Sequence, residues 1–267
     1  MSDFYGKYNG HMWSHLVDCR KQFKDDQIVM LALTGSQNYN LDTPASDMDT
    51  KLTVLPTLED IISNKPAVST THIREDKEHT DFKDLRLMLP TLLKQNVNYV
   101  EQLFATQYII NQDYEEEIEE LKEIREEIAR FCPTKCIMTM YGIAMNKQGR
   151  IFRELPDKKD IFTFGYNPKE AMQLFRIEEF MQRYIDGEPF ANCLITQQRE
   201  QLLLVKCGGF YNANQMLEKV NEALNHVETL KENYITTHEN TYNPTVAIIV
   251  HDIQKQIMMK YLKKVVK

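Results

Sequence analysis

Two aspartates one residue apart, Asp47 and Asp49, follow a Gly-Ser pair and a polar turn in the stretch TGSQNYNLDTPASDMDTK, residues 34–51. Like charges this close destabilise each other unless a cation lies between them. Because alternate residues of a strand share a face, we expect both carboxylates to project into one cleft at the start of a strand. Paired carboxylates suit Mg²⁺, which keeps coordination positions open for phosphate groups. The pair therefore predicts a magnesium site.

Gly35 and Ser36 stand directly after the apolar run IVMLALT, residues 28–34. This run is short and rich in β-branched and apolar residues, which predicts a buried strand ending at the glycine. Glycine lets a phosphate approach the backbone closely, and serine adds a hydroxyl donor. We therefore expect these two residues to bind phosphate beside the metal.

A third carboxylate is expected from Asp81, on a strand predicted at 78–83 that can run beside the strand of the first pair. Lys83, two residues on, shares its face and can contact phosphate. Glu78 and Asp84 are close alternatives to Asp81, because strand ends predicted from sequence shift by a few residues. Three carboxylates can hold two Mg²⁺ or Mn²⁺ ions about 4 Å apart, one activating the attacking oxygen and the other binding the triphosphate.

The elements that position these residues lie in the first third of the chain, where strand and helix signals alternate. Helical spacing predicts a helix from about His11 to Phe23, and Thr57 is the expected N-cap of a short helix. The polar-apolar alternation of residues 49–55 predicts a half-buried strand. Strands are also expected at 28–35, 67–74 and 78–83, the last two joined by the charged connection REDKE. These strands predict a mixed sheet with flanking helices.

From Asp84 onward strand signals are nearly absent, and helical periodicity dominates. Helices are expected at 84–96, with Pro90 as a kink or restart, and at 114–131, 136–149, 168–185, 197–206, 213–233 and 245–267. We therefore predict an α+β protein in which residues 1–105 form a mixed sheet with helices and residues 106–267 form an all-helical domain.

Lys169 and Arg176 lie seven residues apart on the helix expected at 168–185. Two helical turns separate them, so they share a face and could reach a triphosphate together. The alternative is a solvated helix whose cations face water.

Composition limits the class of protein. The 267 residues are 42% hydrophobic and 27% charged, which is ordinary globular usage. No apolar run approaches the roughly 20 residues that span a bilayer, and the first residues lack a secretion signal, so we expect a cytoplasmic protein with no membrane partner. Five unevenly spaced cysteines argue against a disulfide framework. A net charge of −7 argues against binding long duplex nucleic acid.

A family resemblance follows from the motif G-S-x-x-Y-x-L followed by P-x-S-D-x-D. The matching residues are Gly35, Ser36, Tyr39, Leu41, Pro44, Ser46, Asp47 and Asp49. This pattern resembles the nucleotidyltransferase superfamily that includes DNA polymerase beta. More narrowly, it is similar to the predicted nucleotidyltransferases of bacteria and phages grouped with an RNA-repair-pathway member, in which Asn96 and Glu101 match a recurring asparagine and glutamate. The resemblance covers residues 28–105 and, less specifically, 136–187. Where relatives often carry glycine after the tyrosine, this chain has Asn40, which tolerates positive φ.

The resemblance implies a nucleotidyltransferase-type core at 1–105, with the helical domain completing the cleft. It implies a metal-dependent enzyme that transfers a nucleoside monophosphate from an NTP to a hydroxyl, releasing pyrophosphate. The acceptor stays open between an RNA 3′ end, a protein side chain and a small molecule. The alternative function is a nucleotide-binding sensor or interaction protein that keeps the fold without turnover.

Overall fold

A computed structural model of the protein describes residues 9–153 and 159–266. By their internal contacts, the residues form two compact units. The sheet unit comprises the chain up to Asn38, Asp42–Phe131 and the chain from Asn243 onward. The helical unit comprises Tyr39–Leu41 and Cys132–Tyr242. The predicted domains, 1–105 and 106–267, stay a prediction; among the described residues, α5, α6 and α13 belong to the sheet unit.

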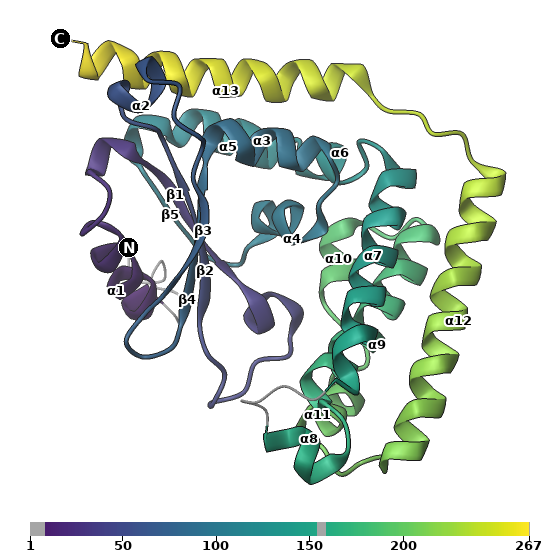
Figure 1. Ribbon diagram of the computed structural model, residues 1–267. Helices are drawn as coiled ribbons and strands as arrows, with labels where there is room; N and C mark the ends of the chain where they lie inside the picture. The colour runs from purple at the N-terminus through teal and green to yellow at the C-terminus, as the bar shows by residue number, and fades with distance from the viewer. Residues whose placement is uncertain (1–8, 154–158, 267) are drawn as a thin grey trace, which may run out of the picture. The chain divides into compact units, whose positions relative to one another are not determined.

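The sheet unit is built on a mixed sheet to which the described residues contribute five strands (Figure 1). The strands lie in the order β3-β4-β2-β1-β5, and β2 and β4 run parallel whereas the other neighbours run antiparallel. Their bounds are β1 Ile28–Thr34, β2 Asp49–Val54, β3 Ser69–Ile73, β4 His79–Asp84 and β5 Tyr108–Ile110. The predicted α+β class with a mixed sheet is thus confirmed.

One face of the sheet is covered by α1, Asn9–Cys19. Its apolar stripe packs into a core with alternate residues of β1 and β2 and with Phe82 of β4. The cluster includes Met12, Leu16, Cys19, Leu31, Leu33, Leu52 and Phe82. Each fully buried aliphatic or aromatic side chain stabilises the fold by roughly 1.5–3 kcal/mol, so α1 is held firmly against the sheet.

The opposite face of the sheet carries the alternate residues of β2 and β4. Tyr99 of α4 and Glu101 of η3 contact lysines of this face. The last helix, α13, packs on α3 and α5 within the same unit (Figure 1). The bounds are α2 Leu58–Ile62, α3 Leu85–Leu93, α4 Val97–Val100, η3 Glu101–Phe104, α5 Glu115–Glu123, α6 Arg125–Ala129 and α13 Pro244–Val265.

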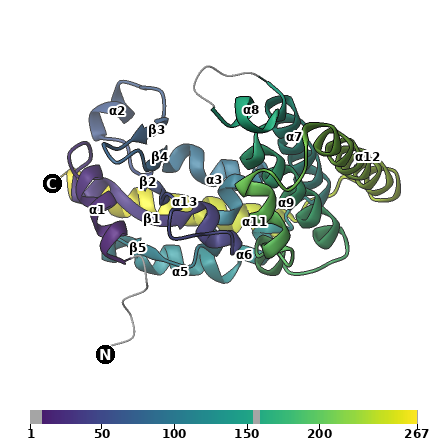
Figure 2. The ribbon, with the colours of Figure 1, turned by 90° about the horizontal axis from the view of Figure 1, so that it is seen from below.

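The helical unit is organised around α9, Pro168–Ile185, whose bounds match the predicted helix. It packs against α7, α10, α11 and α12 (Figure 1), and Figure 2 shows α7, α9, α11 and α12 from below. Phe180 and Tyr184 of α9 meet Phe190 of α10 in edge-to-face contacts. The other bounds are α7 Pro133–Ile151, α8 Lys159–Phe164, α10 Phe190–Leu194, α11 Arg199–Cys207 and α12 Ala213–Thr237. The prediction of an all-helical C-terminal region is confirmed for these residues.

Two local predictions were wrong, and one short strand was not predicted. β2 was expected to be half-buried, but every residue after Asp49 is buried because helices cover both faces. β5 has only three residues, too few to show a strand pattern in the sequence. The helix expected at 114–131 is interrupted at Ile124, which separates α5 from α6.

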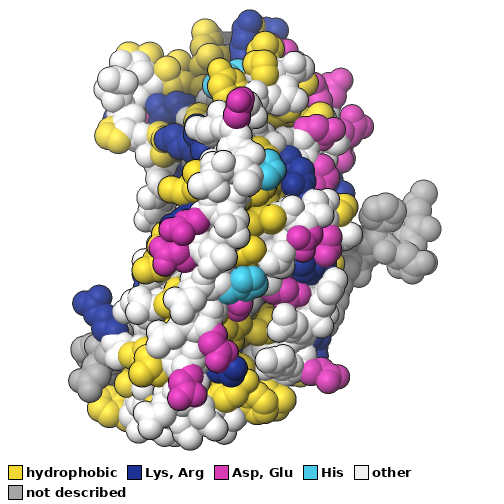
Figure 3. Space-filling view, turned by 90° about the vertical axis from the view of Figure 1, so that its right-hand side faces the viewer, with side chains coloured by type: hydrophobic (Ala, Val, Ile, Leu, Met, Phe, Trp, Pro, Cys, Tyr) yellow, Lys and Arg dark blue, Asp and Glu magenta, His cyan; other side chains and the backbone are white. Residues whose placement is uncertain are grey.

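Within the described part of the chain, no helix is long and apolar enough to cross a membrane. All five cysteines fall in that part, and all are free thiols. On the face drawn in Figure 3, Asp and Glu side chains are interspersed with Lys, Arg and hydrophobic ones.

Candidate active site

The turn after β1 brings the two halves of the G-S…D-x-D motif together. Thr34, the last residue of β1, pairs with Asp49, the first residue of β2. Gly35 follows at φ +86°, a conformation that L side chains rarely adopt. A Cβ placed on Gly35 would lie only 3.4 Å from Oδ2 of Asp49. The glycine therefore leaves open the space beside this carboxylate, and Ser36 follows it in the same turn, η2 Gly35–Tyr39.

Asp49 has an oxygen available for coordination. Its side chain is 43% exposed overall, yet Oδ1 is buried and, among the described residues, has no hydrogen-bond partner. Nδ1 of His79 lies 3.3 Å from this oxygen, close enough for an ion pair when the ring is protonated but outside hydrogen-bond geometry. A buried carboxylate oxygen without a donor is costly unless a cation or a donor reaches it.

Asp47 lies outside the strand that was expected to carry both aspartates. β2 begins at Asp49, and Asp47 precedes it in an irregular segment with its side chain exposed. Its carbonyl oxygen accepts a hydrogen bond from Nε2 of Gln37 at 2.8 Å. Because Asp47 is not part of the pleat, its sharing of one cleft with Asp49 stays a prediction.

Asp81 lies on the same face of the sheet as Asp49. In the parallel pair of β2 and β4, Asp49 is opposite His79 and Lys51 is opposite Asp81. Alternate residues share a face, so the two aspartates are on one face, two register positions apart. Oδ1 of Asp81 accepts a hydrogen bond from the hydroxyl of Thr71 at 2.6 Å, and the side chain is partly exposed.

The two alternatives to Asp81 are occupied elsewhere. Asp84 is buried. Its carboxylate caps α3 by accepting a hydrogen bond from the amide of Arg86, and it also binds the guanidinium of Arg86. Glu78 binds Nε2 of His15 at 2.8 Å and the amide of Met48 at 3.1 Å. His15 belongs to α1, so these contacts direct Glu78 toward the α1 face of the sheet. Of the three, Asp81 is the one on the face of Asp49, and its role as the third carboxylate stays a prediction.

Two lysines accompany the carboxylates on this face. Nζ of Lys83 lies 3.7 Å from the centre of the Tyr99 ring, a cation–π contact. Lys51 was not singled out from the sequence; its Nζ is 2.9 Å from Oε1 of Glu101, and both side chains are nearly buried. The polar-apolar alternation that predicted β2 did place Lys51 on the face of Asp49.

Lys169 and Arg176, the predicted phosphate ligands of α9, belong to the helical unit. Lys169 is exposed, whereas Arg176 is only 6% exposed. The guanidinium of Arg176 lies 3.8 Å from the ring centre of Tyr39, and its Nη1 has no hydrogen-bond partner among the described residues. Phosphate binding by this pair stays a prediction.

The described residues fit a divalent ion only in part. Asp49 offers a carboxylate oxygen with free coordination capacity, and Gly35 leaves space beside it. However, no group of three or more His, Cys, Asp or Glu side chains is placed to hold a metal ion in the described part of the chain. A two-ion site held by Asp47, Asp49 and Asp81 therefore stays a prediction, and it requires the carboxylates to come closer together.

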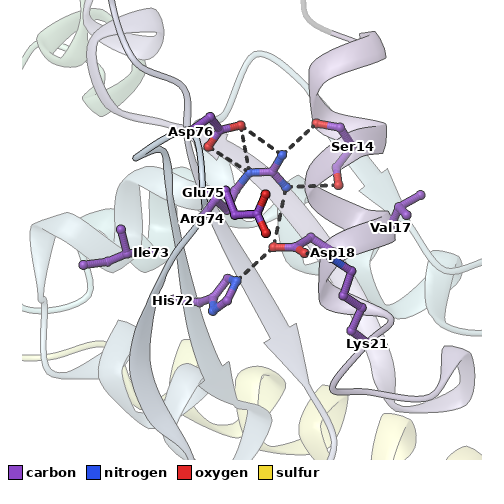
Figure 4. Close-up of a pocket in the computed structure, with 9 residues that line it drawn as sticks. All are labelled: Ser14, Val17, Asp18, Lys21, His72, Ile73, Arg74, Glu75 and Asp76. Atoms are coloured by element: carbon purple, nitrogen blue, oxygen red, sulfur yellow. Dashed lines mark hydrogen bonds and ion pairs between the residues drawn. The ribbon is translucent and has the colours of Figure 1, made fainter.

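A pocket of about 260 Å³ borders the D-M-D segment. Its lining includes His11, Gln37, Asp42, Ser46, Met48 and Glu78. A larger pocket, about 480 Å³, lies between α1 and the β3–β4 hairpin (Figure 4). There Arg74 binds Asp76 and the carbonyl oxygen of Ser14, and His72 binds Asp18. Because these charged groups satisfy one another, the larger pocket is a weaker candidate for a ligand site.

Comparison with known proteins leaves the family unassigned. No protein-family model matches the chain, and no curated protein matches it. Among solved structures, it is similar to a nucleotidyltransferase-like protein from Exiguobacterium sibiricum 255-15, with 11% identity and a TM-score of 0.29. The similarity covers 84% of this chain and 74% of that chain. At this identity and TM-score, the similarity assigns neither a family nor a function to the chain.

Proposed function

We propose that the protein is a metal-dependent nucleotidyltransferase of the cytoplasm, which transfers a nucleoside monophosphate from an NTP to a hydroxyl acceptor and releases pyrophosphate. The observation that carries this proposal is the closeness of Gly35 to Asp49, which places a glycine-containing turn beside a carboxylate whose Oδ1 has no hydrogen-bond partner among the described residues. Anionic phosphates need backbone access, and a metal ion needs oxygen ligands. The adjacent ends of β1 and β2 bring a glycine, for the first requirement, beside one carboxylate, for the second.

Each residue has a role that follows from its chemistry. Gly35 lets the triphosphate approach the backbone, and Ser36 donates its hydroxyl to a phosphate oxygen. Asp47, Asp49 and Asp81 are the carboxylates that would hold Mg²⁺ or Mn²⁺, and Asp81 would also help to deprotonate the acceptor hydroxyl. The bound ions would supply electrostatic stabilisation of the triphosphate and its leaving group.

Lys83, on the same face of the sheet as Asp49 and Asp81, is proposed to neutralise phosphate charge. A phosphate-binding role for Lys169 and Arg176, on α9 of the helical unit, stays a prediction. The guanidinium of Arg176 suits a phosphate because it presents several donors in a fixed plane, and one of its nitrogens is without a partner among the described residues. The acceptor is an RNA 3′ end, a protein side chain or a small hydroxyl compound.

A second candidate function is a nucleotide-binding sensor without turnover. The observation in its favour is that the described carboxylates do not form a three-residue cluster. A protein of this kind would bind an NTP through the turn after β1 and would release no pyrophosphate.

Labelled nucleotides separate the two functions. The purified protein is incubated with each α-³²P-NTP and Mg²⁺ or Mn²⁺, with and without total RNA and cell lysate. Asp49→Asn is compared with Glu75→Gln, which removes one charge from the exposed connection between β3 and β4. Label on RNA, protein or a small molecule with the intact protein and with Glu75→Gln, but not with Asp49→Asn, supports transfer. Nucleotide binding without label or pyrophosphate contradicts it and supports the sensor.

A further inference from the structure

The outer edge of β3 carries backbone hydrogen-bonding groups that no other described strand uses. β3 is the first strand in the order of the sheet and pairs only with β4 among the described strands (Figure 2). Four of its five residues are exposed. Unpaired N–H and C=O groups along a sheet edge form a template for a further strand. β3 can therefore accept a strand from another molecule.

The register with β4 shows which groups of β3 face outward. Just before β3, the carbonyl oxygen of Val68 accepts a hydrogen bond from the amide of Asp84 at 2.9 Å. Just after β3, the amide of Arg74 donates to the carbonyl oxygen of Glu78 at 3.0 Å. Successive residues of an antiparallel strand turn their N–H and C=O to alternate sides, so the even-numbered residues face β4. The odd-numbered residues turn both groups away from β4: Ser69, Thr71 and Ile73.

β3 lacks the features by which sheet edges usually avoid pairing. Natural edge strands are protected by charged residues such as Lys, by Pro, by a bulge or by their shortness. The sequence of β3, STTHI, contains no Lys, Asp, Glu or Pro, and its register with β4 is regular from Ser69 to Ile73. The strand at the other edge, β5, has only three residues. The unprotected edge of the sheet is therefore that of β3.

The outward groups of β3 are complementary to those of a second copy of β3. If two copies run antiparallel about a two-fold axis at Thr71, Ser69 of each copy stands opposite Ile73 of the other. Each pair of outward residues then exchanges two hydrogen bonds, because donors face acceptors at every position. His72 stands opposite Thr70 in this register, so no like charges face each other. One patch thus serves both copies, as a two-fold interface requires.

Apolar side chains accompany this edge. Ile73 is 64% exposed, and Val68, which directly precedes β3, is 38% exposed. A second strand laid along β3 would remove part of this apolar surface from water, which favours association. An interface built on one short strand pair falls below roughly 1,200 Å², the size range of weak and transient complexes. We therefore expect reversible association.

We propose that β3 is a self-association edge, through which two copies of the protein pair antiparallel and form one continuous sheet. This inference goes beyond the proposed function and does not depend on it. Asp81 of β4 is opposite Thr71, so three strand spacings, about 14 Å in all, would separate the two copies of Asp81. The dimer would present the Asp49 face of both copies on one side of the sheet.

The first experiment measures association of the full chain by sedimentation equilibrium, up to several hundred micromolar. Ser69→Pro removes an outward N–H without removing a bond to β4, at the first residue of a strand, where Pro is tolerated. Ser69→Ala is the matched control because it keeps that N–H. The mass of the intact protein should rise from 31.4 kDa toward twice that value. Ser69→Pro should weaken the dimer roughly 10-fold or more, since two hydrogen bonds are lost, and Ser69→Ala should resemble the intact protein.

The second experiment tests the register by disulfide cross-linking. Cys207 is the exposed cysteine and the other four are buried, so both variants carry Cys207→Ser. Thr71→Cys places the two introduced thiols opposite each other, with Cα atoms about 5.5 Å apart, which a disulfide can bridge. Thr70→Cys is the control, because residue 70 stands opposite His72 and its two copies lie more than about 7 Å apart. Under a mild oxidant, Thr71→Cys should form a covalent dimer and Thr70→Cys should not.

Three results would overturn the inference. A protein that stays at its monomer mass, with no cross-link in Thr71→Cys, leaves this edge to a strand of a different protein. A dimer that neither responds to Ser69→Pro nor cross-links through Thr71→Cys uses another surface. Equal weakening by Ser69→Pro and Ser69→Ala would assign the effect to the serine side chain rather than to its backbone. Circular dichroism checks that each variant folds, and if Ser69→Pro does not, the cross-linking pair decides.

Discussion

Replacing Gly35 with alanine tests the open space between Gly35 and the Asp49 carboxylate, on which the proposed function depends. At φ +86°, an alanine residue is disfavoured by roughly 1–2 kcal/mol. The added Cβ would lie 3.4 Å from Oδ2 and 3.6 Å from Cβ of Asp49. Both distances are ordinary van der Waals contacts, so the backbone conformation accounts for most of the loss of stability. For a protein of this size we expect Tm to fall by about 2–8 °C.

The effect on the site should exceed the effect on stability. The methyl group would cover Oδ2 of Asp49, whose Oδ1 is already buried. A ligand or phosphate that needs the space beside Gly35 would be displaced, and displacement by about 1 Å can cost roughly 100-fold in rate. We therefore expect Gly35→Ala to lose most nucleotidyl transfer and to bind Mn²⁺ more weakly, at temperatures where the protein remains folded.

Gly187 offers a matched control. It lies after α9 at φ +85°, and a Cβ there would have no heavy atom within 4 Å. Gly187→Ala should therefore show the same backbone penalty without contacting a carboxylate. The assays are thermal unfolding, Mn²⁺ titration and transfer of labelled nucleotide. Equal activity in the two variants would refute the role given to the space beside Asp49, whatever their stabilities.

Three further predictions concern the sheet unit. Burial lowers the pKa of His15 below its ordinary value of 6.5, so the unfolded state binds its proton first as pH falls, and stability should decrease below about pH 6.5. Denaturant unfolding measured as pH is lowered below about 6.5 should show a smaller decrease in the free energy of unfolding for His15→Asn than for the intact protein. An equal decrease would show that His15 is not the group responsible. Asp84→Ala should cost roughly 2–4 kcal/mol, through a lost helix cap and a lost charge-assisted hydrogen bond. Asp81→Asn should abolish transfer with a stability change within about 0.5 kcal/mol. If Asp81→Asn instead keeps transfer and folded Asp84→Ala loses it, Asp84 is the third carboxylate. Lys51→Met should cost about 3 kcal/mol or more, because it removes the ammonium partner of the nearly buried Glu101 carboxylate. Urea unfolding measures this, and adding Glu101→Leu should recover part of the loss.

Local signals in the sequence were sufficient for much of the fold. The apolar run of β1 and the periodicity of α9 gave these elements close to their observed bounds. Thr57 caps α2 as expected, and its own amide donates in return to Oδ2 of Asp60. Asn40 adopts φ 60°, as expected for a residue in a glycine's place. Each of these features depends on residues within a few positions of one another.

The parts of the site that were not predicted depend on contacts between residues far apart in the chain. Lys51 and Glu101 are separated by 50 residues, and His15 and Glu78 by 63. No pattern within one element shows such a pair, because the topology of the sheet decides which side chains meet. Asp84 differs from these pairs because its role is local. It stands at the start of a predicted helix, where an aspartate can cap the helix instead of binding a metal.

The order of the units along the chain has a consequence for biosynthesis. The helical unit is inserted between Phe131 and Asn243, which are joined by a hydrogen bond from the amide of Asn243 to the carbonyl of Phe131 at 3.2 Å. A ribosome must therefore complete the whole inserted unit before it makes α13. Until then, the surfaces of α3 and α5 that receive the buried residues of α13, such as Val250 and Ile257, face solvent. The nascent sheet unit thus carries an uncovered apolar strip, the kind of surface that chaperones bind and that promotes aggregation.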